Sequence, residues 1–257
     1  MDAVVVSREY VDVAVDARKM RTFVVAPRAP GPHPGVVVYS DIFQLTEPTL
    51  RWCARLAGYG FVVAAPEIYH RLEPPGTVLE FDEEGKRRGQ RDAEETAVAD
   101  FDADIRAALS YLGGHPAVAG GPLGAAGHCT GGHLAFRAAM LPEVRATACW
   151  YATGLHDGKL GSDSDAGSLA RVEEIRGELL MIFGARDPHT PEEGRELIRR
   201  RLDASAVRFT WRLYDAEHAF ARDVGDRYDA EATDQAFAET VALFRRALTE
   251  QRAPAVS

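Results

Sequence analysis

A cysteine, an aspartate and a histidine follow three apolar runs of the chain in the order Cys129, Asp187, His218. A thiol is mostly protonated at neutral pH, so an imidazole must take its proton before it can attack a carbonyl carbon. A carboxylate beside the imidazole holds the ring in the tautomer that accepts this proton. The three residue types therefore predict covalent catalysis, with nucleophile, acid and base in that order along the chain.

Cys129 lies in the stretch Gly127-His128-Cys129-Thr130-Gly131-Gly132. A short apolar run, residues 122–126, precedes it, and a helix-prone run, residues 134–140, follows. A G-x-C-x-G sequence between a strand and a helix predicts a nucleophile elbow, whose sharp turn requires small neighbours. The helix N-terminus behind the cysteine would favour negative charge on its sulfur. The alternative is a glycine-rich turn that carries an inert, buried cysteine.

Asp187 follows the apolar run 179–183, and His218 follows the run 207–214. In a parallel sheet, ligands bind outside the carboxyl ends of the strands, so both side chains are expected near Cys129. Each has a simpler interpretation, because Asp187 precedes a proline and His218 could lie in a surface loop. Their positions after consecutive strands behind the elbow favour the catalytic interpretation.

Strands that alternate with helices predict an α/β fold with a mostly parallel central sheet and helices on both faces. An antiparallel hairpin, residues 10–15 and 21–26 around Asp16-Ala17, is expected to open the chain. We find no internal repeat and no linker, so the sequence predicts a single domain over residues 1–257. The further strands are expected at 35–39, 61–65, 122–126, 146–151, 179–183 and 207–214, and the helices at 49–57, 92–112, 134–140, 192–202 and 233–248.

A polar stretch at residues 70–91 is too long for a routine connection between a strand and a helix. It contains two prolines, a glycine and the basic run Lys86-Arg87-Arg88. We expect it to form a lid over the site, with a solvated loop as the alternative. Tyr69, immediately before this stretch, and Trp150, near the end of a predicted strand, are expected to line the substrate pocket.

The composition is that of an ordinary globular protein, with 46% hydrophobic and 27% charged residues. The net charge of −9 argues against nucleic acid or an anionic membrane as a partner. No apolar run reaches the ~18 residues of a membrane helix. Residues 1–10 lack the apolar core of a signal peptide, and three widely spaced cysteines suit a reducing compartment, so we expect a cytoplasmic protein.

We expect no cofactor and no metal ion. Cys129 has histidines at 128 and 133, but successive residues at an elbow point in different directions and no further ligand has zinc-like spacing. The partner is expected to be a small-molecule substrate, and the chain could be a monomer or a homodimer.

From about Tyr10 to Leu248 the chain resembles the dienelactone hydrolases (carboxymethylenebutenolidases), a family with the α/β-hydrolase fold. The resemblance rests on four pieces: Ser40-Asp41-Ile42-Phe43, Ala65-Pro66-Glu67-Ile68-Tyr69, the cysteine elbow and His218-Ala219-Phe220-Ala221-Arg222. It implies a hydrolase that opens a lactone or cleaves a small carboxylic ester through an acyl-enzyme.

The resemblance also implies roles for single residues. Cys129 would be the nucleophile, Asp187 the orienting acid and His218 the base. The backbone N–H groups of Ile42 and Thr130 would form the oxyanion hole, and Arg222 would bind a substrate carboxylate.

A second basic residue would come from the lid, for which we take Arg87, with Lys86 and Arg88 as the other candidates. Asp41 stands where the family usually has a glutamate, which is one methylene longer and interacts with the resting thiol. We therefore expect the contacts of Asp41 with Cys129 and Arg222 to be longer or water-bridged. Asp41 and Arg222 are both expected to bind substrate.

Two other functions stay open. One is a broader carboxylesterase or thioesterase, or a tailoring enzyme that acts on a larger acyl substrate. The other is a non-catalytic binding or redox-sensing protein that keeps the fold.

Overall fold

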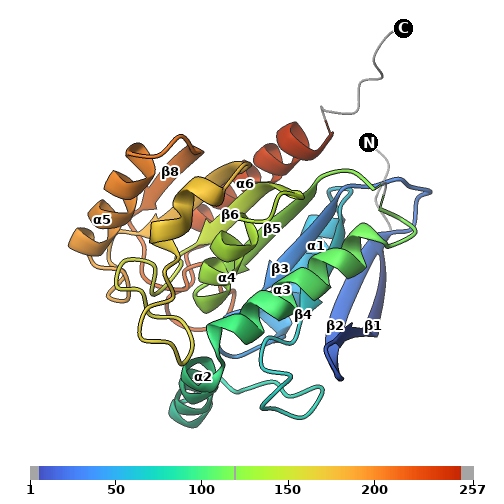
Figure 1. Ribbon diagram of the computed structural model, residues 1–257, viewed down its shortest axis with the longest axis horizontal. Coiled ribbons are helices and arrows are strands. Elements are labelled where there is room, and N and C mark those ends of the chain that lie inside the picture. Colours follow the sequence, from blue (N-terminus) through green and yellow to red (C-terminus); the bar gives the residue numbers. More distant parts are fainter. Residues whose placement is uncertain (1–5, 119, 250–257) are drawn as a thin grey trace, which may run out of the picture.

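The computed structural model describes residues 6–118 and 120–249 (Figure 1). Eight strands form one sheet in the order β1-β2-β4-β3-β5-β6-β7-β8. The strands are β1 (Val6–Val15), β2 (Arg18–Pro27), β3 (Gly35–Tyr39), β4 (Val62–Pro66), β5 (Leu123–His128), β6 (Val144–Trp150), β7 (Glu178–Gly184) and β8 (Arg208–Tyr214).

The hairpin of β1 and β2 turns at Asp16, whose φ of 53° lies in the left-handed region that aspartate tolerates. Strand β2 pairs antiparallel with both β1 and β4, whereas every pair from β4 to β8 is parallel. The expectation of a mostly parallel sheet that opens with an antiparallel hairpin is therefore confirmed. The first five and last eight residues of the expected domain lie outside the described residues.

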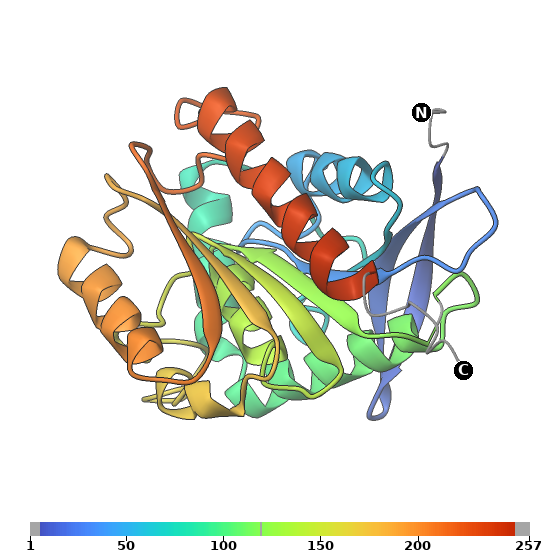
Figure 2. The same ribbon diagram turned by 90° about the horizontal axis from the view of Figure 1, so that it is seen from above.

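Helices cover both faces of the sheet, and Figure 2 shows α1 and α6 on one side and α3 on the other. Side chains of α1 and α6 share one buried apolar cluster, and side chains of α3, α4 and α5 share a second. The helices are α1 (Glu47–Ala57), α2 (Glu83–Glu95), α3 (Val98–Gly113), α4 (Thr130–Ala138), α5 (Glu192–Asp203) and α6 (Ala230–Thr249), with a 3-10 helix, η1 (Leu169–Glu174).

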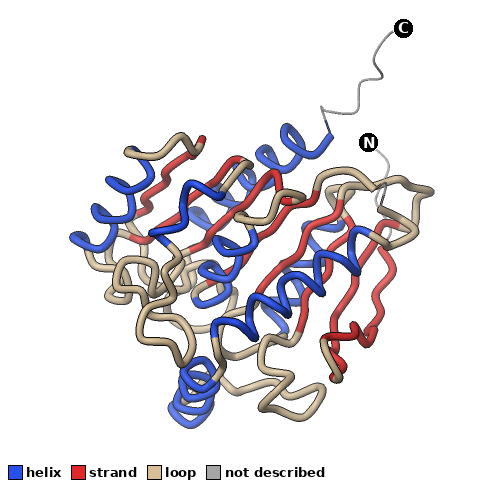
Figure 3. The backbone as a smooth tube through the Cα atoms, viewed as in Figure 1, coloured by secondary structure: helices blue, strands red, loops and turns tan. Residues whose placement is uncertain are grey.

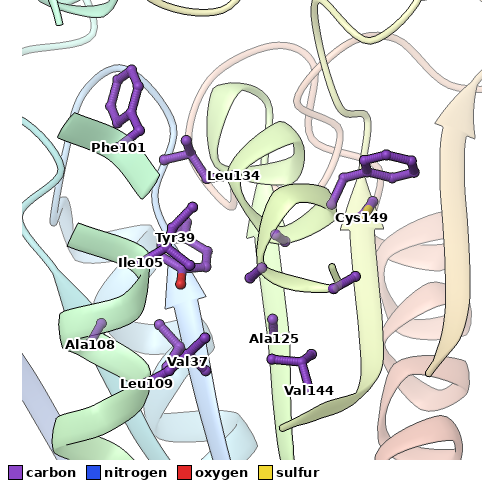
Figure 4. Close-up of a cluster of buried hydrophobic side chains, with 14 of the residues drawn as sticks. Val37, Tyr39, Phe101, Ile105, Ala108, Leu109, Ala125, Leu134, Val144 and Cys149 are labelled. Carbon is purple, nitrogen blue, oxygen red and sulfur yellow. The ribbon is translucent and has the colours of Figure 1, made fainter. Parts of the chain in front are cut away.

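The central strands are apolar on both faces because both are covered. All five residues of β3 and all six of β5 are buried. In Figure 4, Val37 and Tyr39 of β3 lie close to Ile105 and Leu109 of α3. Two apolar layers thus fix the strands, and with them the loops at the strands' carboxyl ends.

The segment between β4 and α3 differs from the sequence-based expectation. We expected an irregular stretch over 70–91 and one helix over 92–112, but the structure has α2 and α3 as separate helices, visible in Figure 3. Asp82 caps α2 by accepting a hydrogen bond from the Gly85 N–H at 2.7 Å, with acidic residues in the first turn that suit the helix dipole. Two glycines within α2 lower its intrinsic helix propensity and hid it from the sequence pattern.

The break between α2 and α3 also has a local cause. The Thr96 hydroxyl bonds back to the Asp92 carbonyl at 2.8 Å, and Ala97 is extended. The Val98 N–H then donates to the Asp163 carboxylate at 2.9 Å, which supplies the start of α3 with a cap from a distant loop. We call residues 70–97 the cap segment.

No helix in the described part of the chain is both long and apolar enough to cross a membrane.

Candidate active site

Cys129 occupies the sharp turn between β5 and α4, with φ 57° and ψ −122°. Glycine is required on both sides of it. A Cβ atom at Gly127 would lie 1.9 Å from the Gly131 carbonyl oxygen, and one at Gly131 would lie 2.2 Å from the Tyr39 carbonyl oxygen. Backbone atoms therefore approach Gly127 and Gly131 too closely for any side chain at these two positions. The turn holds Cys129 in a strained backbone conformation, with its side chain half-buried.

Asp187 and His218 come together at the ends of β7 and β8. Their side chains are buried, and His218 Nδ1 lies 2.7 Å from Asp187 Oδ2. The other carboxylate oxygen accepts the backbone N–H of His189 at 2.8 Å. Because an ionised carboxylate can only accept, Nδ1 carries the proton of this hydrogen bond and Nε2 is left for another partner.

The charge on His218 is set by its two neighbours. Burial lowers the pKa of His218, but the negative charge of Cys129 and the hydrogen bond and charge of Asp187 outweigh it and raise the pKa to about 10. The imidazole therefore holds a proton beside the sulfur at neutral pH, an arrangement that favours a thiolate.

Two aromatic contacts fix the plane of the His218 ring. The His189 ring lies 4.5 Å from it and the Tyr151 ring 5.1 Å, both near edge-to-face geometry. Partial burial and the charge of His218 lower the pKa of His189, so this second imidazole is neutral beside the charged one.

A cavity of about 990 Å³ opens above these groups. The predicted residues that line it come from two loops and the elbow: Asp41, Ile42, Cys129, Thr130, His218 and Arg222. Lys86 of α2 also lines it, so part of the cap segment borders the same space.

Two backbone N–H groups at the cavity wall are available to an anion. Thr130 is the first residue of α4, and the first N–H groups of a helix have no intrahelical partner. The Ile42 N–H, in the turn after β3, makes no hydrogen bond with any residue that the structure describes. Both residues line the cavity, and their role as oxyanion donors stays a prediction of the family resemblance.

Asp41 and Arg222 lie at the same wall. Asp41 is half-buried and accepts the Phe43 N–H at 3.0 Å. Burial raises the pKa of Asp41, and the charges of Arg222 and His218 and the Phe43 N–H offset part of that rise. The Arg222 guanidinium lies 4.4 Å from the centre of the Phe81 ring and 5.1 Å from that of Phe43. Within residues 6–118 and 120–249, Arg222 forms no ion pair.

The three basic candidates of the cap segment face different ways. Lys86 lines the cavity. Arg87 lies outside it, exposed and paired with Glu84. Arg88 is also outside and pairs with Glu73, which ties α2 to the preceding loop. Of the three, only the lysine is placed to meet a ligand in the cavity.

Tyr69 and Trp150 are fully buried and do not line the cavity. The Tyr69 hydroxyl has no hydrogen-bond partner among the described residues. Burial raises the pKa of Tyr69 well above its usual value, and the nearby charges of Cys129 and Asp41 add to this. The Trp150 ring packs against His128 and Tyr151. The prediction that Tyr69 and Trp150 line the pocket is therefore wrong, and both rings are buried behind the residues that line the cavity.

Phe81 and Thr153 are among the lining residues that the sequence did not predict. Phe81 lies in the cap segment and packs on Phe43 at 4.8 Å, a contact that no local pattern predicts. Thr153 lies 4.0 Å from the Cys129 sulfur. It follows β6 at the carboxyl end of the sheet, so its position after a predicted strand was a usable signal.

No group of three or more His, Cys, Asp or Glu side chains in the described ranges could hold a metal ion. His128 and His133 lie on opposite sides of the elbow cysteine in sequence, and burial lowers the pKa of each to about 3, so both rings are neutral.

Known proteins resemble the chain over nearly its whole length. The sequence profile of the Dienelactone hydrolase family matches residues 20–248. A Saccharomyces cerevisiae protein named "Putative carboxymethylenebutenolidase" is 35% identical over 239 residues, covering 89% of this chain and 87% of that protein. The carboxymethylenebutenolidase of Pseudomonas sp. P51 is 29% identical over 219 residues, 85% of this chain and 87% of that protein.

A solved structure agrees. The "Putative Dienelactone Hydrolase" of Klebsiella pneumoniae superimposes with a TM-score of 0.80 at 24% identity, over 94% of this chain and 99% of that one. The fold is thus the α/β-hydrolase fold, and the chain belongs to the dienelactone hydrolase family and is a hydrolase of that type.

Proposed function

We propose that the protein is a cysteine-dependent hydrolase that opens a lactone or cleaves a small carboxylic ester through an acyl-enzyme on Cys129. The observation that carries the proposal is the buried His218–Asp187 pair at the cavity that Cys129 lines. A carboxylate, an imidazole and a thiol in this arrangement are the parts that nucleophilic catalysis requires.

The chemistry follows from the placement of these groups. His218 holds the proton that has left the thiol, and the thiolate attacks the acyl carbon of the substrate. The N–H groups of Ile42 and Thr130 stabilise the oxyanion that forms, a contribution of about 3–4 kcal/mol for one donor in comparable sites. The imidazolium protonates the departing oxygen, and water, activated by the same imidazole, then hydrolyses the thioester and frees Cys129.

The charges in the cavity favour a substrate that carries a carboxylate. Arg222 has no ion-pair partner in the described part of the chain and stacks on Phe43 and Phe81. A guanidinium in this state can form two parallel hydrogen bonds with a carboxylate. Lys86, which also lines the cavity, would add a second positive charge.

A second candidate function is supported by the size of the cavity. A volume of about 990 Å³ lies at the upper end of ordinary ligand pockets, well above what a small lactone fills. A carboxylesterase, a thioesterase or a tailoring enzyme on a larger acyl substrate would use this space and the same catalytic groups. The cap segment would act in either case as the lid that closes over the substrate.

The experiment is a panel of substrates with the wild-type protein and the Cys129→Ala variant. The panel holds a carboxylated dienelactone, neutral p-nitrophenyl esters and acyl thioesters. Fastest turnover of the dienelactone, abolished in the variant, supports the first function. Turnover of only neutral esters or thioesters favours the second, and no turnover of any substrate favours a binding or redox-sensing protein.

A further inference from the structure

The sulfur of Cys129 has a neighbour besides His218. Thr153 Oγ1 lies 4.0 Å from Cys129 Sγ, and both residues line the cavity. The sulfur is the sole hydrogen-bond partner of this hydroxyl among the residues that the structure describes. The hydroxyl is thus free to donate its proton toward the sulfur.

The backbone of Thr153 is held at both of its polar groups. Its N–H donates to the Cys129 carbonyl at 3.3 Å. Its carbonyl oxygen lies 2.9 Å from Nδ1 of His133, a buried residue on α4, the helix that starts immediately after Cys129. Thr153 is therefore fixed relative to the nucleophile and not merely near it.

The protonation of His133 follows from its partners. Burial and the charge of Arg137 lower the pKa of His133, so the ring is neutral. A carbonyl can only accept, so Nδ1 carries the hydrogen and donates to Thr153. Nε2 must then accept from the Ser168 hydroxyl at 2.7 Å, and that hydroxyl accepts from Arg137 at 2.8 Å. Each hydrogen bond in this buried series therefore has a defined donor and acceptor.

We propose that Thr153 is a further catalytic residue of the hydrolase, whose hydroxyl donates a hydrogen bond to the Cys129 thiolate, and that His133 is the residue that positions it. The proposal rests on the proposed function, because it assigns the sulfur as the reacting atom. A hydrogen bond to the charged form of a group favours that form.

The hydroxyl acts at two steps. Before acylation it stabilises the thiolate after the proton has moved to His218. In the second half of the reaction, water adds to the acyl carbon and gives a proton to His218, the carbon–sulfur bond breaks, and its electron pair returns to the sulfur. Thr153 then donates to the departing thiolate. Asp41 cannot do this in its ionised form, since a carboxylate only accepts.

The test compares Thr153→Val, which keeps the shape and removes the donor, with Thr153→Ser, which keeps the donor. The measurement is the rate of alkylation of Cys129 by iodoacetamide as a function of pH, read by peptide mass spectrometry. Mapping separates Cys129 from Cys53 and Cys149, which are buried. Thermal unfolding of each variant monitors folding.

The proposal predicts that Thr153→Val moves the midpoint of the alkylation profile up by about one pH unit, the effect of one hydrogen bond to a charged group. Thr153→Ser should keep the wild-type midpoint. The proposal would be wrong if the alkylation profile of Thr153→Val coincided with that of the wild type. It would also be wrong if the midpoint of Thr153→Ser shifted as much as that of Thr153→Val. Alkylation needs no substrate, so these outcomes are independent of whether any ester is hydrolysed.

Discussion

The loops that carry the predicted triad and the cap segment border the same cavity but are held in different ways. Cys129, Asp187 and His218 come from strand ends between two apolar layers, and each has its geometry fixed by buried contacts. The cap segment meets the cavity through Phe81 and through α2, in which Arg87 pairs with Glu84 at the surface and Arg88 with Glu73 of the preceding loop. We propose from this difference that the loops of the sheet make and break bonds and that the cap segment selects the substrate.

The largest expected effect comes from the sheet side. Asp187→Asn should lower kcat by about 10³–10⁴-fold with little change in KM, because an amide no longer enforces the reactive tautomer of His218. Steady-state kinetics on the fastest substrate measures it. Asp215→Asn is the matched control, since Asp215 follows the neighbouring strand β8 but is exposed. An Asp187→Asn enzyme that keeps a tenth of the activity would break the comparison.

The next effect tests where the two regions touch. A Cβ atom at Gly89 of α2 would lie 2.3 Å from the carbonyl oxygen of Ile42, so Gly89→Ala must push apart the cap and the predicted oxyanion hole. Such overpacking costs about 1–3 kcal/mol. If the strain displaces the Ile42 N–H, kcat/KM should fall about 10- to 100-fold.

Gly113→Ala is the control for that substitution. Gly113 also lies in a helix, α3, but a Cβ atom there would have its nearest neighbour at 3.8 Å, an ordinary contact. This variant should keep full activity. A Gly89→Ala protein with the activity and melting temperature of wild type would show that the cap does not support the site.

The smallest effect concerns selectivity. Lys86→Ala should raise KM for a carboxylated substrate about two- to five-fold and leave neutral esters unchanged, as expected of one partly exposed charge. Arg87→Ala should change neither, because that side chain points away from the cavity and pairs with Glu84. If Lys86→Ala and Arg87→Ala changed KM for the carboxylated substrate equally, the proposal that the cap segment selects anionic substrates would be wrong.

The same contrast separates what the sequence could predict from what it could not. The strands were predictable because a strand covered on both faces is apolar throughout, as β3 is. The elbow was predictable because the backbone crossing at Gly127 and Gly131 leaves only glycine possible. Strand order along the chain then placed Asp187 and His218 at the same edge.

The sequence pattern predicted less about the structure of the cap segment. The glycines of α2 pack against backbone carbonyls, so their presence is explained by packing in the folded protein. Within the helix itself, glycine is unfavourable. Lys86, Arg87 and Arg88 are adjacent in sequence, but successive residues of a helix point about 100° apart, so only one can face the cavity. We expected Arg87 to reach the cavity, whereas Lys86 does. A correct choice depends on the presence of α2 and on its rotation about its axis, and the sequence pattern showed neither. The start of α4 was likewise expected at Leu134, whereas it begins at Thr130.

The central claim, that Cys129 is the nucleophile, is tested most directly by trapping the acyl-enzyme. The wild-type protein is mixed with a p-nitrophenyl ester, quenched in acid during the first turnover, digested and analysed by mass spectrometry. We expect one acyl group on the peptide that contains Cys129 and none on the corresponding peptide of Cys129→Ala. An unmodified Cys129 peptide, together with a Cys129→Ala variant that hydrolyses the ester at the wild-type rate, would contradict it.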